Sequence, residues 1–190
     1  WYIDLKINPY KTKNSLKLIC IGRLVDQKDH LTLLKSINDI KNKIEVELIL
    51  IGQGKNKNFL NQYIKINRLE KIVKILGYKK NPYPFIKRSD VLVLTSTYEG
   101  LPNVLLEAIV LKKFVISSNC PTGPKEILDN GAGGILFKTG NYRDLSKKII
   151  LYKKHSKIIK RKIKHAYSSL KRYDLSKNLN LYYKNLIRFT

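Results

Sequence analysis

Acidic residues are scarce in this chain of 190 residues, which has 14 Asp and Glu against 38 Lys and Arg. Long apolar runs are missing too, since no stretch approaches the roughly 20 residues that a membrane-spanning helix needs. The first residues also lack the charged and apolar regions of a signal peptide. We therefore expect a cytoplasmic protein, and the hydrophobic content of 43% suffices for the core of one domain.

Cysteine is rare as well, and Cys20 and Cys120 form neither a Cys-x-x-Cys pair nor a metal-ligand spacing. Cys20 lies inside an apolar run, residues 18–21, and is expected to be a small buried side chain. The histidines are scattered, and no Asp-x-Asp motif occurs. These absences argue against a disulfide framework and favour a reducing compartment. They also give no sign of a metal site.

The formal net charge of +24 suggests an anionic partner. Only seven of the 38 basic residues are arginine, which is the usual side chain for reading bases and phosphates. The composition therefore argues against sequence-specific binding of nucleic acid. Three explanations of the charge stay open at this point: a codon bias toward Lys, Ile and Asn, an anionic membrane surface, and non-specific nucleic-acid binding.

Short apolar segments alternate with segments of helical periodicity along most of the chain. Strands are predicted at residues 16–21, 46–51, 72–76, 91–94, 114–117 and 135–137, and the main helices at 30–40, 59–66, 84–88, 102–110 and 144–152. This alternation predicts an α/β fold, a Rossmann-like doubly wound parallel sheet of about six strands followed by C-terminal helices. Ligands of such sheets bind outside the carboxyl ends of the strands.

The two ends of the chain differ from this pattern. Residues 1–15 contain Asn8-Pro9 and a polar run, and they are predicted to be a linker that precedes a domain at 16–172. Residues 153–172 contain no acid, carry nine Lys and Arg, and keep an apolar stripe, which predicts an amphipathic basic helix. Residues 173–190 are predicted to form a last helix.

The most informative stretch follows the predicted strand at 91–94. Gly100 breaks the chain, and Pro102 suits the first position of a helix because it has no N–H and a fixed φ. The order is therefore strand, loop and helix N-terminus. Free backbone N–H groups and partial positive charge at a helix N-terminus suit a phosphate.

Two carboxylates flank this helix start. Glu99 lies in the loop before it, and Glu107 lies five residues beyond Pro102, about 7–8 Å along the axis. Beside a bound anion, both make better sense as acceptors for hydroxyl groups, such as those of a ribose near Glu107 and a sugar near Glu99. The alternative stays open that Glu99 is a solvated loop residue and Glu107 a favourable charge in an early helical turn.

Glu99 and Glu107, with Gly-Leu-Pro-Asn between them, resemble the E-x7-E motif of the retaining glycosyltransferases of family 4. The resemblance covers residues 16–154. It implies the GT-B fold, in which two Rossmann-like domains face each other across a cleft. This chain would be the C-terminal domain, which holds the nucleotide-sugar donor.

Further motifs extend the resemblance to a set of site residues. Gly22-Arg23-Leu24 followed by Gln27-Lys28 looks like the family's first-strand motif, which implies that Arg23 and Lys28 stabilise the leaving diphosphate. Gly77-Tyr78 matches the place where the family holds the nucleobase. The implied catalytic residues are Arg23, Lys28 and Glu99, and the implied donor-binding residues are Gly22, Arg23, Lys28, Tyr78, Glu99, Gly100, Leu101, Asn103 and Glu107.

The family also implies a reaction. We expect metal-independent transfer of a hexose or N-acetylhexosamine from a UDP- or GDP-sugar to a surface-glycan or lipid-linked acceptor, as in lipopolysaccharide or capsule synthesis. Residues 120–128 resemble a loop of members that build bacterial surface glycans. The family's acceptor domain is absent, so the chain is expected to be either a fragment or one subunit, inactive alone, working at the inner face of the cell membrane.

A hypothesis from another class stays open beside this one. The chain could be a non-catalytic module whose basic surface docks on nucleic acid or an acidic polymer, with the site motifs merely inherited. Retention of Arg23, Lys28, Glu99 and Glu107 together argues against it, because a site without function has no reason to keep all four.

Overall fold

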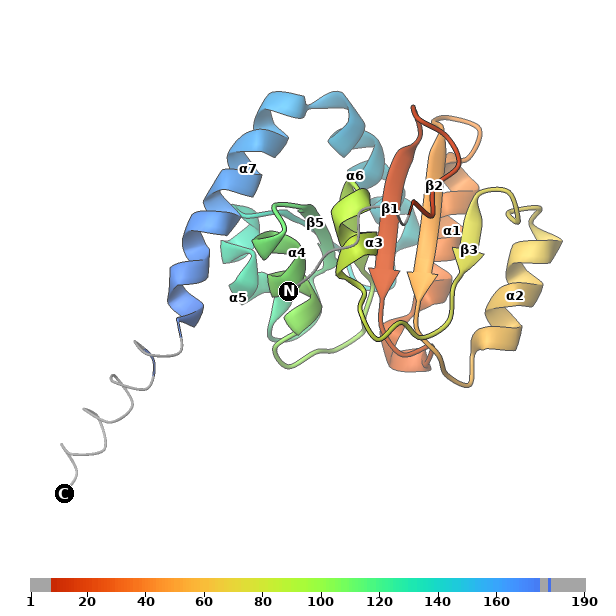
Figure 1. Ribbon diagram of the computed structural model, residues 1–190, viewed down its shortest axis with the longest axis horizontal. Coiled ribbons are helices and arrows are strands. Elements are labelled where there is room, and N and C mark those ends of the chain that lie inside the picture. Colours follow the sequence, from red (N-terminus) through yellow and green to blue (C-terminus); the bar gives the residue numbers. More distant parts are fainter. Residues whose placement is uncertain (1–7, 175–177, 179–190) are drawn as a thin grey trace, which may run out of the picture.

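A parallel sheet lies at the centre of the protein in the computed structural model, which describes residues 8–174 and 178 (Figure 1). The strands are β1 (Leu16–Ile21), β2 (Val46–Ile51), β3 (Val73–Ile75), β4 (Val91–Leu94), β5 (Phe114–Ser118) and β6 (Ile135–Phe137). Their order is β3-β2-β1-β4-β5-β6, and every neighbouring pair is parallel. The predicted Rossmann-like, doubly wound sheet is confirmed.

Helices cover both faces of the sheet (Figure 1). They are α1 (His30–Ile40), α2 (Lys57–Ile66), α3 (Tyr83–Arg88), α4 (Asn103–Val110), α5 (Pro124–Ile127), α6 (Tyr142–Lys154) and α7 (Ser156–Ser169), with 3-10 turns η1 (Asp26–Lys28), η2 (Asp129–Gly131) and η3 (Leu170–Tyr173). Apolar residues of α1, α2 and α6 pack on one face, and those of α3, α4 and α5 on the other.

The strand order places a topological switch between β1 and β4. The chain winds outward from β1 through β2 to β3, then returns to β4 on the other side of β1 and continues to β6. β4 is buried along its whole length, as expected for a strand covered on both faces. Loops leave β1 and β4 in opposite directions here, which opens a crevice where such folds bind ligands.

The two helices predicted at 144–152 and 153–172 are present as α6 and α7, but α7 begins only at Ser156 and ends at Ser169, before η3. His155, with φ −123° and ψ 61°, separates α6 from α7. The break lets Ile149 and Ile159, on either side of it, enter the same core. The predicted apolar stripe of α7 included Tyr167, which is wrong, because Ala166 is buried at 4% exposure while Tyr167 is 46% exposed.

The start of α4 also differs from the prediction by one residue. Pro102 has extended angles, φ −74° and ψ 93°, and precedes the helix, which begins at Asn103. The strand, loop and helix order predicted for this stretch is otherwise present.

Residues 8–15, the described part of the predicted linker, are anchored to the domain. Tyr10 is buried and donates a hydrogen bond from its hydroxyl to the Leu18 carbonyl oxygen at 3.0 Å. The Glu47 carboxylate accepts from Thr12 and Ser15 hydroxyls at 2.6 and 2.8 Å, and from the backbone N–H groups of Lys11 and Thr12. The predicted last helix, 173–190, lies almost entirely outside the described residues.

No helix within the described ranges is long and apolar enough to cross a membrane.

Candidate active site

The carboxyl ends of the central strands surround a cleft of about 680 Å³. Loops after β1, β2, β3 and β4 and the first turns of α4 form its wall. Eight of the nine predicted donor-binding residues line it: Gly22, Arg23, Lys28, Tyr78, Glu99, Leu101, Asn103 and Glu107. The ninth, Gly100, is exposed and does not line the cleft. The structure therefore brings together residues that lie up to 85 positions apart, from Gly22 to Glu107.

Close backbone packing gives the first two loops their shape. Gly52 has φ +153°, and a Cβ placed on it would lie 1.9 Å from the Gly22 carbonyl oxygen. The Gly22 N–H donates to the Ile51 carbonyl oxygen at 3.0 Å. Only glycine fits at position 52, so the two loops that follow β1 and β2 can touch.

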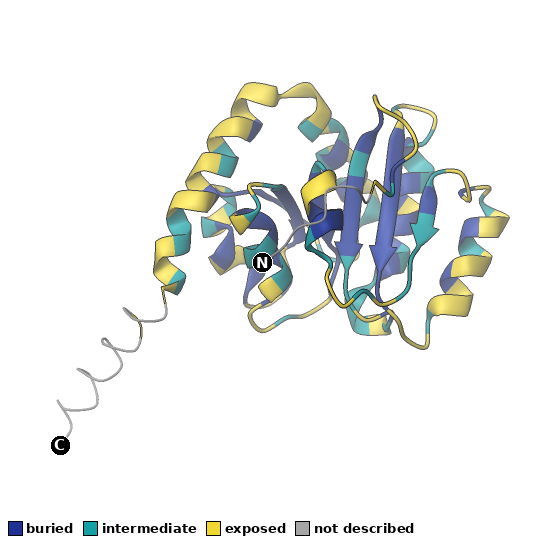
Figure 2. Cartoon of the chain, in the orientation of Figure 1, coloured by how far each residue is buried: buried dark blue, intermediate teal, exposed yellow. Residues whose placement is uncertain are grey.

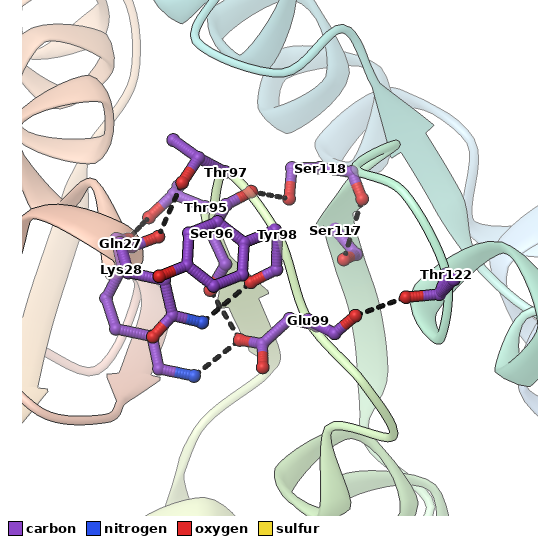
Figure 3. Close-up of polar contacts among 10 residues, drawn as sticks. All are labelled: Gln27, Lys28, Thr95, Ser96, Thr97, Tyr98, Glu99, Ser117, Ser118 and Thr122. Carbon is purple, nitrogen blue, oxygen red and sulfur yellow. Dashed lines mark hydrogen bonds and ion pairs between the residues drawn. The ribbon is translucent and has the colours of Figure 1, made fainter.

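An ion pair joins the two predicted catalytic loops. The Lys28 Nζ atom lies 2.5 Å from Glu99 Oε1, and the two side chains are 18% and 8% exposed (Figure 3). The Ser96 hydroxyl donates to the same oxygen at 2.6 Å. An ammonium group has three N–H donors, so Lys28 keeps donors for a second anion beside Glu99.

Further hydrogen bonds fasten the loop of η1 to the loop after β4. The Thr95 hydroxyl donates to the Lys28 carbonyl oxygen at 2.8 Å, and the Thr97 N–H donates to the Gln27 carbonyl oxygen at 2.8 Å. The Gln27 side-chain amide donates in return to the Tyr98 carbonyl oxygen at 2.7 Å (Figure 3). These hydrogen bonds hold the two loops together and so keep Lys28 beside Glu99.

A third loop, after β5, supports the same segment from behind. The Thr122 hydroxyl donates to the Glu99 carbonyl oxygen, and the Ser118 hydroxyl donates to the Ser96 carbonyl oxygen at 2.7 Å. Gly123 has φ +66°, and a Cβ on it would lie 2.0 Å from the Gly100 carbonyl oxygen. Gly100 thus makes a backbone contact in this support.

Glu107 lies on α4 in a different environment from Glu99. It is half-buried, and burial raises the pKa of its carboxyl group. Tyr83 lines the cleft beside it, and burial followed by the charge of Glu107 raises the pKa of Tyr83. Within the described part of the chain, no hydrogen bond or ion pair reaches the Glu107 carboxylate.

The cleft is rich in positive charge. Arg23 is exposed in it, and none of the ion pairs found among the described residues involves its guanidinium group. Lys79 and Lys80 also line the cleft, although neither belongs to a motif recognised in the sequence. The exposed Tyr78 ring, 65% exposed, stands at the same wall.

Sequence reasoning also missed the residues that position the predicted ones. Ser96, Gln27 and Thr122 make their contacts through tertiary structure, and isolated Ser, Gln and Thr carry no spacing signal. His30 is buried at the start of α1, where burial and then the charge of Lys28 lower the pKa of its imidazole to about 4. Cys20 is buried as predicted, and burial raises the pKa of its thiol to about 12.

Metal-ligating side chains do not gather in the residues that the structure describes: no three His, Cys, Asp or Glu lie close enough to hold an ion. Positive charge in the cleft comes from Arg23, the lysines and the start of α4.

Comparison with solved structures shows the same fold in glycosyltransferases. The Anabaena protein HepE, in complex with UDP, superposes with a TM-score of 0.83 at 22% identity, over 92% of this chain and 49% of HepE. The C-terminal domain of a Francisella tularensis group 1 glycosyl transferase, LpcC, superposes with a TM-score of 0.73 at 21% identity, over 85% of this chain and 88% of that domain. The predicted GT-B type of fold is confirmed.

Proteins related in sequence are also named as glycosyltransferases. An uncharacterised glycosyltransferase of Methanocaldococcus jannaschii is 43% identical over 117 residues, 61% of this chain and 29% of its own length. The amylovoran biosynthesis glycosyltransferase AmsD of Erwinia amylovora is 33% identical over 143 residues, 68% of this chain and 40% of its own length. The chain thus spans well under half of these relatives. The family model described as "Glycosyl transferases group 1" matches residues 4–169, and the chain belongs to this family.

Proposed function

We propose that this chain is the donor-binding domain of a retaining glycosyltransferase. The enzyme would move a hexose or N-acetylhexosamine from a UDP- or GDP-sugar to a surface-glycan or lipid-linked acceptor. The observation that carries the proposal is the cleft, in which Arg23 and Lys28 face the start of α4 and two carboxylates, Glu99 and Glu107, lie on either side of that start.

The charges of the cleft suit a nucleoside diphosphate. Its phosphates would lie at the N-terminus of α4, where backbone N–H groups and the helix dipole favour an anion. Glu107, about one turn into α4 and without a described protein donor, would accept the ribose hydroxyls. Tyr78 would pack beside the base, and Glu99 would face the sugar.

Catalysis would then rest on fixed cations. As the bond from the anomeric carbon to the diphosphate breaks, negative charge grows on the leaving phosphate. Arg23 and Lys28, already positioned in the cleft, would stabilise it more strongly in the transition state than in the substrate. We propose that the reaction is metal-independent because these cations and the helix N-terminus supply the positive charge.

The names of two relatives support the proposed substrate class. A Campylobacter jejuni relative, 28% identical over 124 residues, is named for transfer of N-acetylgalactosamine to a diphospho-undecaprenol glycan. A Staphylococcus aureus relative, 29% identical over 163 residues, is named for capsular polysaccharide biosynthesis. We therefore favour surface-glycan synthesis, with an acceptor that is lipid-linked or part of the growing glycan.

An acceptor wall has to come from outside these residues. The cleft would form only the donor side of the site, whereas HepE is about twice as long as the part that matches. We propose that the acceptor domain is supplied by the rest of a longer protein or by a separate subunit. This chain alone should bind donor and transfer little.

Calorimetry against UDP, GDP and their sugar conjugates tests the proposal. We expect one nucleotide to bind with a stoichiometry of one, and Arg23→Gln to weaken it about tenfold, as loss of a charge-assisted contact would. Arg68→Gln, a matched change on the exposed chain beyond α2, should have no effect. A folded chain that binds no nucleotide at millimolar concentration would refute the proposal. Salt-dependent binding of arbitrary DNA in that case would support the non-catalytic basic module.

We also propose that the enzyme is cytoplasmic and touches the inner face of the cell membrane through α7 and the end of α6. Lys153, Lys154, Lys157, Lys160 and Lys164 are exposed, and no acid occurs between Asp144 and Asp174. The outer face of α7 is exposed along its length (Figure 2). Each basic residue near an anionic surface contributes on the order of 1 kcal/mol, so several together would hold the domain reversibly.

Liposome co-sedimentation tests this contact. Binding should require anionic lipid and fade between about 0.1 and 0.5 M salt as the Debye length shrinks. Changing Lys153, Lys157, Lys160 and Lys164 to Gln should abolish it, whereas the same change at Lys13, Lys57, Lys65 and Lys71, exposed elsewhere, should not. Equal binding to neutral liposomes would rule the contact out.

A further inference from the structure

Glu99 is predicted to meet the donor sugar, yet it lies in a loop. A catalytic or binding group has to be held within about 0.5 Å of its working position, which loops achieve only with support from surrounding side chains. The Glu99 carboxylate is 8% exposed, so its neighbours determine its orientation.

The two carboxylate oxygens of Glu99 have different surroundings (Figure 3). Oε1 accepts from the Lys28 ammonium at 2.5 Å and from the Ser96 hydroxyl at 2.6 Å. None of the hydrogen bonds among the described residues ends on Oε2. The protein thus satisfies one oxygen twice and leaves the other as an acceptor next to the cleft.

Lys28 cannot fix this orientation alone. It has a flexible stem, and its ammonium group would also bind the diphosphate, which would shift it relative to Glu99. Ser96 is fully buried at the end of β4, and its own carbonyl oxygen accepts from the Ser118 hydroxyl at 2.7 Å. Its hydroxyl is therefore a fixed donor, three residues before Glu99, that stays in place when Lys28 moves toward a phosphate.

We propose that Ser96 is a positioning residue that holds Glu99 through Oε1, so that Oε2 accepts a hydroxyl of the donor sugar. The inference rests on the proposed function, since it assigns the sugar-facing atom within the same site. The two donors to Glu99 Oε1 then have different roles. Lys28 binds the diphosphate, and Ser96 keeps the Glu99 carboxylate oriented toward the sugar.

The inference predicts a split between nucleotide and sugar. Ser96→Ala should weaken binding of the UDP-sugar, or GDP-sugar, about threefold to tenfold, the loss of one hydrogen bond. Binding of the sugar-free nucleotide should stay within about twofold, because Arg23, Lys28 and α4 are untouched. Glu99→Gln should show the same split. The double variant should lose no more than Glu99→Gln alone, because Ser96 acts through Glu99.

Ser36→Ala is the matched control. Ser36 is also fully buried, and its hydroxyl donates to the Leu33 carbonyl oxygen at 2.7 Å within α1. It should leave the ratio of the two affinities unchanged. A general loss of packing would weaken both ligands together, so the ratio separates positioning from stability.

Calorimetry with UDP and UDP-N-acetylglucosamine, or GDP and GDP-mannose, measures this ratio. A ratio that Ser96→Ala and Glu99→Gln leave unchanged would overturn the inference while the proposed function stands. A crystal structure of ligand-free Ser96→Ala tests the positioning without any nucleotide. Glu99 in more than one rotamer supports the inference, and an unchanged Glu99 overturns it.

Discussion

Glu107→Gln should separate binding from stability in this protein. The Glu107 carboxyl group is half-buried, its pKa is raised by burial, and no described protein group donates to it. A raised pKa means that the ionised form costs the folded state free energy, which appears as pH rises through that pKa. The neutral amide removes this cost, so the variant should be as stable as the original chain at pH 7, or more stable.

Nucleotide binding should change in the opposite direction. A carboxylate that accepts ribose hydroxyls makes charge-assisted hydrogen bonds worth roughly 1.5–3 kcal/mol, against roughly 0.5–1.5 for a neutral acceptor. The difference of about 1.4 kcal/mol corresponds to about a tenfold weaker affinity for the nucleoside diphosphate. A residue that served only the fold would lower stability and affinity together.

The pH dependence gives a second signature. Affinity of the original chain should fall as Glu107 protonates, at a higher pH than for an ordinary glutamate, because burial raises its pKa. The nucleotide's own phosphate titration is common to both proteins, so the difference between original and variant isolates Glu107. Calorimetry from pH 5 to 8, with thermal unfolding in the same buffers, measures both effects. Unchanged affinity in the variant, or a loss of stability that matches the loss of binding, would refute the reasoning.

Two further predictions concern the stability of the fold. Burial alone would raise the pKa of Glu47, but hydrogen bonds, from Thr12 first, bring it from 4.5 down to about 2. Glu47→Gln should therefore lower the free energy of unfolding by roughly 3 kcal/mol at pH 7. In denaturation experiments, the difference between the variant and the original chain should shrink as the pH falls from 4.5 to 2. A difference that stays constant with pH would contradict this. Gly123→Ala should lower the free energy of unfolding by roughly 1–2 kcal/mol more than Gly131→Ala does. Both glycines have positive φ, but only at position 123 would the Cβ meet backbone, the Gly100 carbonyl oxygen at 2.0 Å; equal unfolding free energies would refute it.

The fold was predictable because its signals are local. Each strand is a short apolar run, such as residues 91–94, and the helices between strands keep a regular apolar spacing. A boundary between two helices was predicted at residues 152 and 153, but its position at His155 was not, since helical periodicity runs through residue 155 and only packing against the core shows where the direction changes. The burial of Tyr10 has the same cause, because its partner carbonyl belongs to β1.

The site residues that belong to sequence motifs were predictable. Glu99 and Glu107 share one continuous stretch, and Arg23 and Lys28 share another, so their spacing could be compared with a family pattern. The contacts of Ser96 could not be foreseen, since its bond to one oxygen of Glu99 depends on side-chain orientation. The ion pair between Lys28 and Glu99 spans 71 positions and exists only once β1 and β4 are neighbours.

Amide chemical-shift mapping tests most directly whether the cleft binds a nucleoside diphosphate. In ¹⁵N-labelled protein titrated with UDP or GDP, we predict the largest changes at Gly22, Arg23, Tyr78, Asn103 and Val104, all of which line the cleft. The shifts should saturate with one affinity. Saturating changes confined to α7, or no changes at millimolar nucleotide in a folded chain, would contradict the account.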